Sequence, residues 1–393
     1  MRRVATRISL SPSLPIFDYV ASNVTATIAF MPHETSTILG RVAGGSNLSF
    51  DEISSTFDSI MRGEWAEDEI ALLLTALAAK GETVDEVAGA ADAMRRHMTP
   101  IRSRHPRILD TCGTGGGGSS LFNISTTAAI VAAAAGVPVA KHGNRSITSR
   151  SGSADVLAEL GVNINASIAQ VETCLDELGI CFCFAPLAHP SMKHVAAVRK
   201  KIGIRTIFNI LGPLVNPAGA CYQLLGAGRP ELRPLLAGAI ARLGTRRTLV
   251  VSGEDGLGDV TLNGLTHVTE VRSNLPLPPV ESQVFPPLPL GEGRGEGLRE
   301  FTWSPEDFGI PRASLDSLTI TDPAASAAMI HKILRGIPGP ARDIVVLNAA
   351  AGLVAAEKTD DLQAAASLAA AAIDSGAAKE LLERLSNRSY IPA

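Results

Sequence analysis

Residues 110–155, DTCGTGGGGSSLFNISTTAAIVAAAAGVPVAKHGNRSITSRSGSAD, contain the pattern that decides the fold. The stretch places five glycines within residues 113–118, then an alanine-rich apolar segment, then a Lys-His-Gly-Asn-Arg cluster, all within about one βαβ unit. Glycines let backbone N–H groups approach a ligand closely, and a helix N-terminus adds a field that favours anions. Lys141 and Arg145 add full positive charges. Together these features predict a pocket for a multiply phosphorylated small molecule.

Short apolar runs that end in small residues alternate with helical patterns along the chain. The runs are RILDTCG, VPVAKHG, ICFCFAP, YQLLGAG and RTLVVSG, which start at residues 107, 137, 180, 222 and 247. Alternation of this kind predicts a largely parallel sheet covered by helices. Ligands of such sheets bind at the carboxyl ends of the strands. Gly113 and His142 both fall at those ends.

The remaining patterned segments are predicted to be helical. Ser49–Glu52 and Thr83–Glu86 match the capping-box pattern, and residues 67–80 keep a broad apolar face. Residues 322–387 are alanine-rich and helical in pattern.

Two segments have neither helix nor strand periodicity. Residues 1–35 are rich in Arg, Ser and Thr, a composition that mimics a transit peptide. We interpret them as a disordered or spurious extension, because Met31 shortly precedes the first patterned segment. Residues 275–297, which are rich in Pro and Gly, are interpreted as a poorly ordered insert, with a polyproline ligand for a partner as the alternative.

The overall composition narrows the class of protein. The 393 residues carry a net charge of −4 and are 46% hydrophobic but only 4% aromatic, so the core must be mainly aliphatic. This charge argues against a nucleic-acid binder with a broad basic surface. The five cysteines show no metal-ligand spacing, and no apolar run reaches the ~18 residues of a membrane span. We therefore expect a cytoplasmic protein with reduced thiols.

The glycine run alone leaves the ligand open. Residues 113–118 contain G-x-G-x-x-G, but a dinucleotide site also needs an acidic residue about 20 positions further on, after a second strand. That strand ends instead in Lys141-His142, which favours phosphate, and the chain has no GxxxxGK[ST] motif. A glycine-rich turn without a ligand is the alternative. His142 is either a packed, hydrogen-bonded histidine or a wall of the site.

Polar residues open the next predicted helix. Asn123, Ser125 and Thr126 could each be an ordinary N-cap, but an amide and several hydroxyls beside the glycine run suit phosphate oxygens and Mg²⁺ better. Further along, Arg199 and Arg205 each offer a planar guanidinium that suits a substrate carboxylate. Spacing does not decide which of the two points inward.

Taken together, these motifs resemble the anthranilate phosphoribosyltransferases, enzymes of tryptophan biosynthesis. The matching segments are GTGG at 113–116, FNIST at 122–126, VAKHGNR at 139–145, SGSAD at 151–155, FAPLAHPSMKHV at 184–195 and RTIFNILGPLVNPA at 205–218. The resemblance implies an α/β protein with a small all-helical domain and a larger α/β domain around a central, largely parallel sheet flanked by helices.

The resemblance also implies how the chain is divided. Residues 36–105, joined by helices near 192–215, would form the helical domain, and residues 106–390 would bind phosphoribosyl pyrophosphate (PRPP). The active site would lie at the hinge between them, and the helical domain would form a homodimer.

Residue roles follow from the same resemblance. The PRPP contacts fall on Gly113, Gly116, Asn123, Ser125, Thr126, Lys141, Ser149 and Ser153, with Gly117 and Leu121 at two further contact positions. The anthranilate contacts fall on Gly113, Asn144 and Arg199, so the resemblance favours Arg199 over Arg205. Lys141, Asn144 and Arg199 are expected to carry catalysis, and Ser125 and Asp259 match Mg²⁺ ligands.

Three residues depart from the family pattern on the pyrophosphate side. Gly117 stands where the family has an acid, Leu121 where it has Thr, and Gly258 where it has the first of two paired acids. All three changes remove polar or charged groups. We expect weaker or single-site Mg²⁺ binding, with Asp255 or Glu254 as residues that could compensate.

The reaction implied joins the amine of anthranilate to C1 of the ribosyl ring and releases pyrophosphate. The nearest rival of the same fold is a pyrimidine nucleoside phosphorylase, which would be expected to carry KHSTGG where this chain has KHGNR. A rival of another class is a phosphoribosyltransferase-like protein that binds nucleic acid or is an inactive paralogue. Asn144, Arg199 and the acidic charge argue against it.

Overall fold

The computed structural model describes residues 33–115, 120–146, 149–273 and 297–393. Gly116 and Gly117 lie outside these ranges, and so do residues 1–32 and 274–296, on which most of the expectations for the extension and the insert fall. Helix α2 (His33–Ala43) begins inside the expected extension of residues 1–35, which corrects that boundary. The same helix carries Leu39 and Val42, whose side chains are buried.

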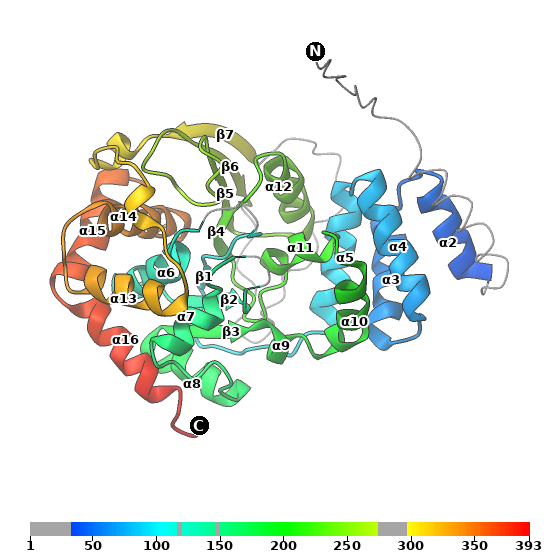
Figure 1. The fold of residues 1–393 in the computed structure, drawn as a ribbon, viewed down its shortest axis with the longest axis horizontal. Helices are drawn as coiled ribbons and strands as arrows, with labels where there is room; N and C mark the ends of the chain where they lie inside the picture. The colour runs from blue at the N-terminus through cyan, green and yellow to red at the C-terminus, as the bar shows by residue number, and fades with distance from the viewer. Residues whose placement is uncertain (1–32, 116–119, 147–148, 274–296) are drawn as a thin grey trace, which may run out of the picture.

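A bundle of helices forms the smaller part of the molecule (Figure 1). It contains α2, α3 (Phe50–Arg62), α4 (Glu67–Lys80) and α5 (Val84–Arg96), with α10 (Lys193–Ile202) packed on α3 and α4 and α11 (Phe208–Leu211) packed on α5. Both predicted capping boxes are present, so Ser49 and Thr83 satisfy free N–H groups where α3 and α5 begin. Segments far apart in the chain therefore share one helical layer.

The larger part is built on a sheet that has seven strands within the described residues, in the order β3-β2-β1-β4-β5-β6-β7. The strands are β1 (Leu109–Asp110), β2 (Val139–Gly143), β3 (Ile180–Phe184), β4 (Tyr222–Gly226), β5 (Arg247–Gly253), β6 (Thr266–Arg272) and β7 (Leu298–Trp303). The five strands predicted from sequence pair in parallel, whereas β6 and β7 add an antiparallel edge. The predicted fold class is confirmed.

Helices cover both faces of this sheet. The helices of the α/β part are α6 (Ile124–Ala134), α7 (Ser153–Glu159), α8 (Ile168–Leu178), α9 (Ala185–Ala188), α12 (Leu232–Leu243), α13 (Pro323–Leu334), α14 (Pro340–Ala355), α15 (Leu362–Asp374) and α16 (Ala377–Arg388). Side chains of β4 and β5 alternate between two cores, as the period of two of a strand requires. Leu224 and Leu249 face the core of α6 and α14, whereas Leu225 and Val250 face α12 and the helical bundle. The bundle is thus fixed to one face of the sheet.

None of the helices in the described ranges is long and apolar enough to cross a membrane.

Two helical glycines should respond in opposite directions to alanine, because only one of them faces open space. Nothing lies within 4 Å of a Cβ built at Gly40 in α2, so Gly40→Ala should raise the free energy of unfolding by about 0.5–1 kcal/mol. A Cβ at Gly89 in α5 would overlap the carbonyl oxygen of Phe50 and the side chain of Ile53, so Gly89→Ala should lower it by about 1–3 kcal/mol. Urea unfolding followed by circular dichroism measures both, and equal shifts would contradict the packing of α3 on α5.

Candidate active site

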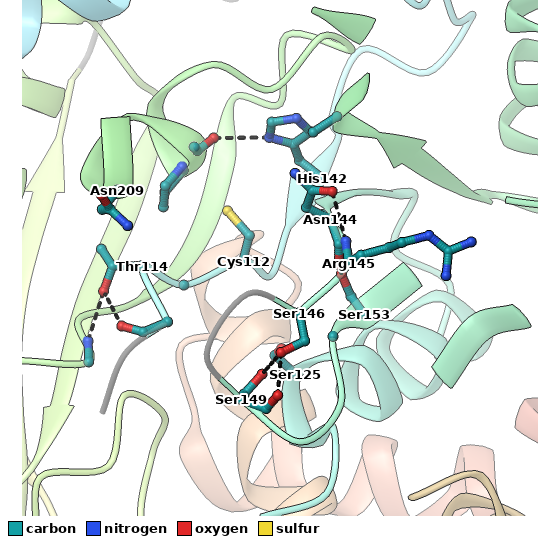
Figure 2. A pocket seen from close by; sticks show the side chains of 18 of the residues that line it. Cys112, Thr114, Ser125, His142, Asn144, Arg145, Ser146, Ser149, Ser153 and Asn209 are labelled. Carbon is teal, nitrogen blue, oxygen red and sulfur yellow. Dashed lines mark hydrogen bonds between the residues drawn. The ribbon is translucent and has the colours of Figure 1, made fainter. Parts of the chain in front are cut away.

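One cavity of about 970 Å³ lies where the carboxyl ends of β1, β2 and β4 meet the helical bundle. Its wall comes from the glycine loop, the start of α6, the segment after β2, helices α10 and α11, and the loop at 257–259. In Figure 2, Thr114 and Asn209 of α11 lie on one side of this cavity, and His142 and Asn144 lie on the other. Both parts of the molecule therefore contribute to the same site.

The structure brings together every expected site residue that it describes. Lining the cavity are Gly113, Leu121, Asn123, Ser125, Thr126, Lys141, Asn144, Ser149, Ser153, Arg199 and Asp259. Gly116 and Gly117 belong to the part of the glycine loop outside the described residues. Arg205 also lines the cavity, but its side chain is exposed, whereas that of Arg199 is half-buried.

The charge of the wall is strongly positive. Six cationic side chains line it, and among the described lining residues Asp259 is the single carboxylate. The cations are Lys141, Arg145, Arg150, Lys193, Arg199 and Arg205. A cleft lined by one sign of charge concentrates ligands of the other sign, so this cavity favours anions.

Lys141 is the buried cation at the sheet side of the cavity, with 4% of the residue exposed. Its Nζ donates to the carbonyl oxygen of Thr111 at 2.7 Å and to Oγ of Ser125 at 3.3 Å. Desolvation by burial lowers the pKa of Lys141, and the charges of Asp110 and Asp259 oppose that shift. The ammonium group is therefore held by neutral oxygens at the mouth of α6, where an anion would complete its coordination.

Asn123 is fixed in one orientation at the start of α6. Its Oδ1 accepts hydrogen bonds from the hydroxyls of Ser151 at 2.7 Å and Ser326 at 2.8 Å, and its Nδ2 donates to the carbonyl oxygen of Ser151 at 3.2 Å. The side chain does not cap α6. The Thr126 hydroxyl is buried and has no hydrogen-bond partner among the described residues. The helix mouth thus keeps donors for an anion.

The segment after β2 packs tightly around two glycines. A Cβ at Gly143 would overlap the side chain of Ser153, and one at Gly152 would overlap the backbone at residues 144–146. Oγ of Ser153 donates to the carbonyl oxygen of Asn144 at 3.3 Å. The Asn144 side chain is exposed, and its Oδ1 accepts the Arg145 N–H at 2.8 Å. Ser146 and Ser149 hydrogen-bond to each other (Figure 2).

Asp259 is the negative side chain of the described cavity wall, and its charge interacts with that of Lys141. Burial raises the pKa of the Asp259 carboxyl to about 7, and the Lys141 charge lowers it by a smaller amount. Asp255 accepts from the N–H of Leu257 and the hydroxyl of Thr261, and Glu254 accepts from the N–H of Leu265. Neither lines the cavity, so their placement does not support the expectation that Asp255 or Glu254 compensates for Gly258.

Two departures from the family pattern have a steric or packing reason. A Cβ at Gly258 would lie 2.9 Å from Cα and 3.0 Å from N of Gly228, so the backbone here fits glycine alone without a shift. Leu121 packs against the α/β core, and its backbone bridges Thr319. The polar groups absent from these positions are therefore replaced by close packing.

Sequence reasoning left the role of His142 open and did not single out His189. Nδ1 of His142 donates to the carbonyl oxygen of Gly212 at 2.9 Å, because a carbonyl can only accept. Its Nε2 lies 3.2 Å from Nε2 of His189, within hydrogen-bond distance. Burial lowers the pKa of both rings, for His189 to about 3, so the pair is neutral at pH 7. His142 is both hydrogen-bonded and part of the wall.

Family models match both parts of the chain. The helical bundle domain of a glycosyl transferase family matches residues 36–98, and the a/b domain of a glycosyl transferase family matches residues 105–379. An anthranilate phosphoribosyltransferase of Moorella thermoacetica is 47% identical over 88% of this chain and 96% of its own. One from Rhodopirellula baltica is 44% identical over 89% of this chain and 96% of its own.

Solved structures agree with the family models. The anthranilate phosphoribosyltransferase of Thermus thermophilus superposes with a TM-score of 0.79 at 40% identity, over 90% of this chain and 99% of its own. The Saccharomyces cerevisiae enzyme, in a complex with PRPP and Mg, superposes with a TM-score of 0.77 at 27% identity. The match covers 93% of this chain and 98% of the yeast chain. This chain belongs to the glycosyl transferase family with a helical bundle and an α/β domain, among the anthranilate phosphoribosyltransferases.

The buried histidine pair should make stability depend on pH. His189 titrates near pH 6.5 when unfolded but near pH 3 when folded, so the unfolded state binds more protons between these values. The free energy of unfolding should fall as pH drops below 6.5, by up to about 1.4 kcal/mol per pH unit from His189. His189→Gln keeps an amide donor without titrating, so urea unfolding from pH 7 to 4.5 should show a slope smaller by about one proton. An unchanged slope would contradict a neutral buried His189.

Proposed function

We propose that the chain transfers the phosphoribosyl group of PRPP to the amine of anthranilate, giving N-(5-phosphoribosyl)anthranilate and pyrophosphate. One observation carries this proposal: a single cavity has a buried Lys141 with neutral donors at its sheet side and a half-buried Arg199 at its helical side. The phosphates of one substrate would lie near Lys141, and the carboxylate of an aromatic acid would lie near Arg199. Solved yeast relatives bind PRPP with Mg and, separately, 4-fluoroanthranilate.

We assign the two ends of the cavity to the two substrates. PRPP would contact the glycine loop, the mouth of α6 and the segment after β2, through Gly113, Gly116, Gly117, Leu121, Asn123, Ser125, Thr126, Lys141, Ser149 and Ser153. Anthranilate would contact Gly113, Asn144 and Arg199. The positive wall and the fixed amide of Asn123 support this division.

Catalysis on this proposal depends on position and charge. The amine of anthranilate is neutral at pH 7, so its lone pair can attack C1 without a base to generate it. The N–C1 bond forms as the C1–O bond to pyrophosphate breaks, and the nitrogen then loses a proton to water or to the released pyrophosphate. Lys141 and the N-terminus of α6 would stabilise the charge of the leaving pyrophosphate. Holding both substrates at the domain boundary would keep water from the reacting carbon.

Mg²⁺ fits the residues present only as an ion shared with the substrate. Within the described ranges no three His, Cys, Asp or Glu side chains come together to hold a metal. Mg²⁺ is commonly held by one or two carboxylates together with substrate phosphates. Asp259 and Ser125 would supply the protein ligands, and the ion would neutralise pyrophosphate charge. Gly258 removes the place for a second carboxylate.

A homodimer through the helical domain and a cytoplasmic location are part of the same proposal. They rest on the family resemblance and on the cysteines, all five of which are buried and free.

The proposal is tested by following anthranilate fluorescence in the presence of PRPP and Mg²⁺. Loss of anthranilate that requires PRPP, together with release of pyrophosphate, is the expected result. If neither occurs, the alternative of a nucleic-acid-binding or inactive paralogue is favoured, and salt-sensitive retention on a DNA column separates those two.

Lys141→Ala should damage PRPP binding more than any other single change at the sheet side. Loss of a charge-assisted contact of about 1.5–3 kcal/mol predicts a rise of roughly 10- to 150-fold in KM for PRPP, or an equivalent fall in kcat/KM. Lys200→Ala is the matched control, because Lys200 is an exposed cation of α10 that does not line the cavity. Near-normal kinetics for the Lys141 variant would refute the assignment.

Activity should follow Mg²⁺ with a single saturable component, because Asp259 is the one carboxylate of the described wall. Asp259→Asn should raise the Mg²⁺ concentration needed for half-maximal rate by about tenfold or more, because it removes the one charged protein ligand of the ion. Asp255→Asn is the matched control, because Asp255 does not line the cavity and instead accepts a hydrogen bond from the Thr261 hydroxyl. It should leave the dependence of the rate on Mg²⁺ concentration unaltered. Two components of ordinary affinity would disprove single-site binding.

A further inference from the structure

Arg199 is unusual among the cations of the cavity in how it is held. It is half-buried, and within the described residues no carboxylate or carbonyl pairs with it, whereas Lys141 and Arg145 both have such partners. Its guanidinium carbon instead lies 5.3 Å from the centroid of the Phe208 ring. A long side chain without partners would sample many rotamers at a considerable entropic cost on binding. The ring is therefore the contact that restricts it.

The Phe208 ring is itself fixed from behind. Phe208 belongs to α11, is 7% exposed, and its ring centroid lies 5.4 Å from that of Phe57 in α3, with 37° between the planes. The start of α11 is held because Oδ1 of Asn209 accepts the Thr206 N–H at 2.9 Å. The position of the ring thus depends on the bundle core and does not require Arg199.

Contact through a ring face has a chemical consequence that an ion pair would not have. A guanidinium over an aromatic face is attracted by its π electrons, and the N–H groups at the edge of the guanidinium plane stay unused. A carboxylate partner would instead occupy the same N–H fork that a substrate carboxylate needs. The desolvated guanidinium therefore keeps its donors for a ligand in the cavity.

We propose that Phe208 is a positioning residue: its ring holds the Arg199 guanidinium at the cavity wall with the N–H fork free, and so sets the selectivity for an aromatic amine that carries a carboxylate. This inference rests on the proposed function, because it deepens the role of Arg199 in the same site. Phe208 also lines the cavity, but the proposal concerns its action through Arg199.

The test replaces the ring and separates the two substrates kinetically. Phe208→Leu should raise KM for anthranilate by about 2- to 30-fold, the range of one cation–π contact, and should leave KM for PRPP within twofold. The inhibition constant of anthranilamide, which keeps the ring and amine but has no charge, should stay within twofold. Phe208→Tyr keeps an aromatic face and should restore KM for anthranilate to within about twofold of the wild type.

Phe50→Leu is the matched control for the loss of a ring under a guanidinium. Phe50 begins α3, the guanidinium carbon of Arg242 lies 5.1 Å from the centroid of its ring, and neither residue lines the cavity. KM for anthranilate should therefore stay within about twofold of the wild type in this variant. Equal rises in KM for the Phe50 and Phe208 variants, or a Phe208→Tyr variant as impaired as Phe208→Leu, would overturn the inference.

The outcomes separate this inference from the proposed function. A wild-type protein that consumes no anthranilate with PRPP and Mg²⁺ contradicts the function itself. An active wild type whose Phe208→Leu variant keeps KM for anthranilate contradicts only the positioning role. If Phe208→Leu does not fold, Phe208→Met takes its place, because methionine keeps an apolar side chain but has no ring face under Arg199; it should raise KM for anthranilate by the same factor of about 2 to 30.

Discussion

The site depends on direct contact between three stretches of glycine backbone. A Cβ at Gly113 would lie 2.8 Å from the carbonyl oxygen of Gly226, and one at Gly226 would overlap the carbonyl oxygen of Gly258. The Thr114 N–H donates to the same Gly226 oxygen at 2.9 Å, and the Thr114 hydroxyl accepts the Gly228 N–H at 3.0 Å. These contacts hold the ends of β1 and β4 and the Asp259 loop against one another, so a cavity edge forms from three separate segments.

The second constraint is that one sheet serves two cores. Because successive residues of β4 and β5 point to opposite faces, the same strands bury side chains against α14 and against α12 with the helical bundle. The cavity lies along the line where these layers meet. The side of the cavity that we propose for phosphate is thereby built on strand ends and α6, and the side that we propose for the carboxylate on α10 and α11, each supported by a different core.

Local patterns in the sequence were enough for much of this architecture. The capping boxes at Ser49 and Thr83 and the five parallel strands are dictated by short-range chemistry, and the structure confirms them. Strands β6 (THVTEVR) and β7 (LREFTW) were not predicted, because both mix charged and polar residues with apolar ones and a Pro- and Gly-rich segment separates them in the sequence. Spacing alone did not separate Arg199 from Arg205, since burial depends on how α10 and α11 pack; the family resemblance favoured Arg199. The same holds for Ser326, which reaches Asn123 from 203 positions away.

Strands β6 and β7 are joined at the edge of the sheet through residues 274–296, which lie outside the described ranges. The Arg272 N–H donates to the carbonyl oxygen of Gly297 at 3.0 Å, so the hairpin is closed at its neck by its own backbone. Closing a longer loop at such a neck costs little, since the entropy grows only with the logarithm of length. The connection between β6 and β7 is consequently a point of the fold where added chain length costs little free energy, at the edge of the sheet remote from β1 and β2.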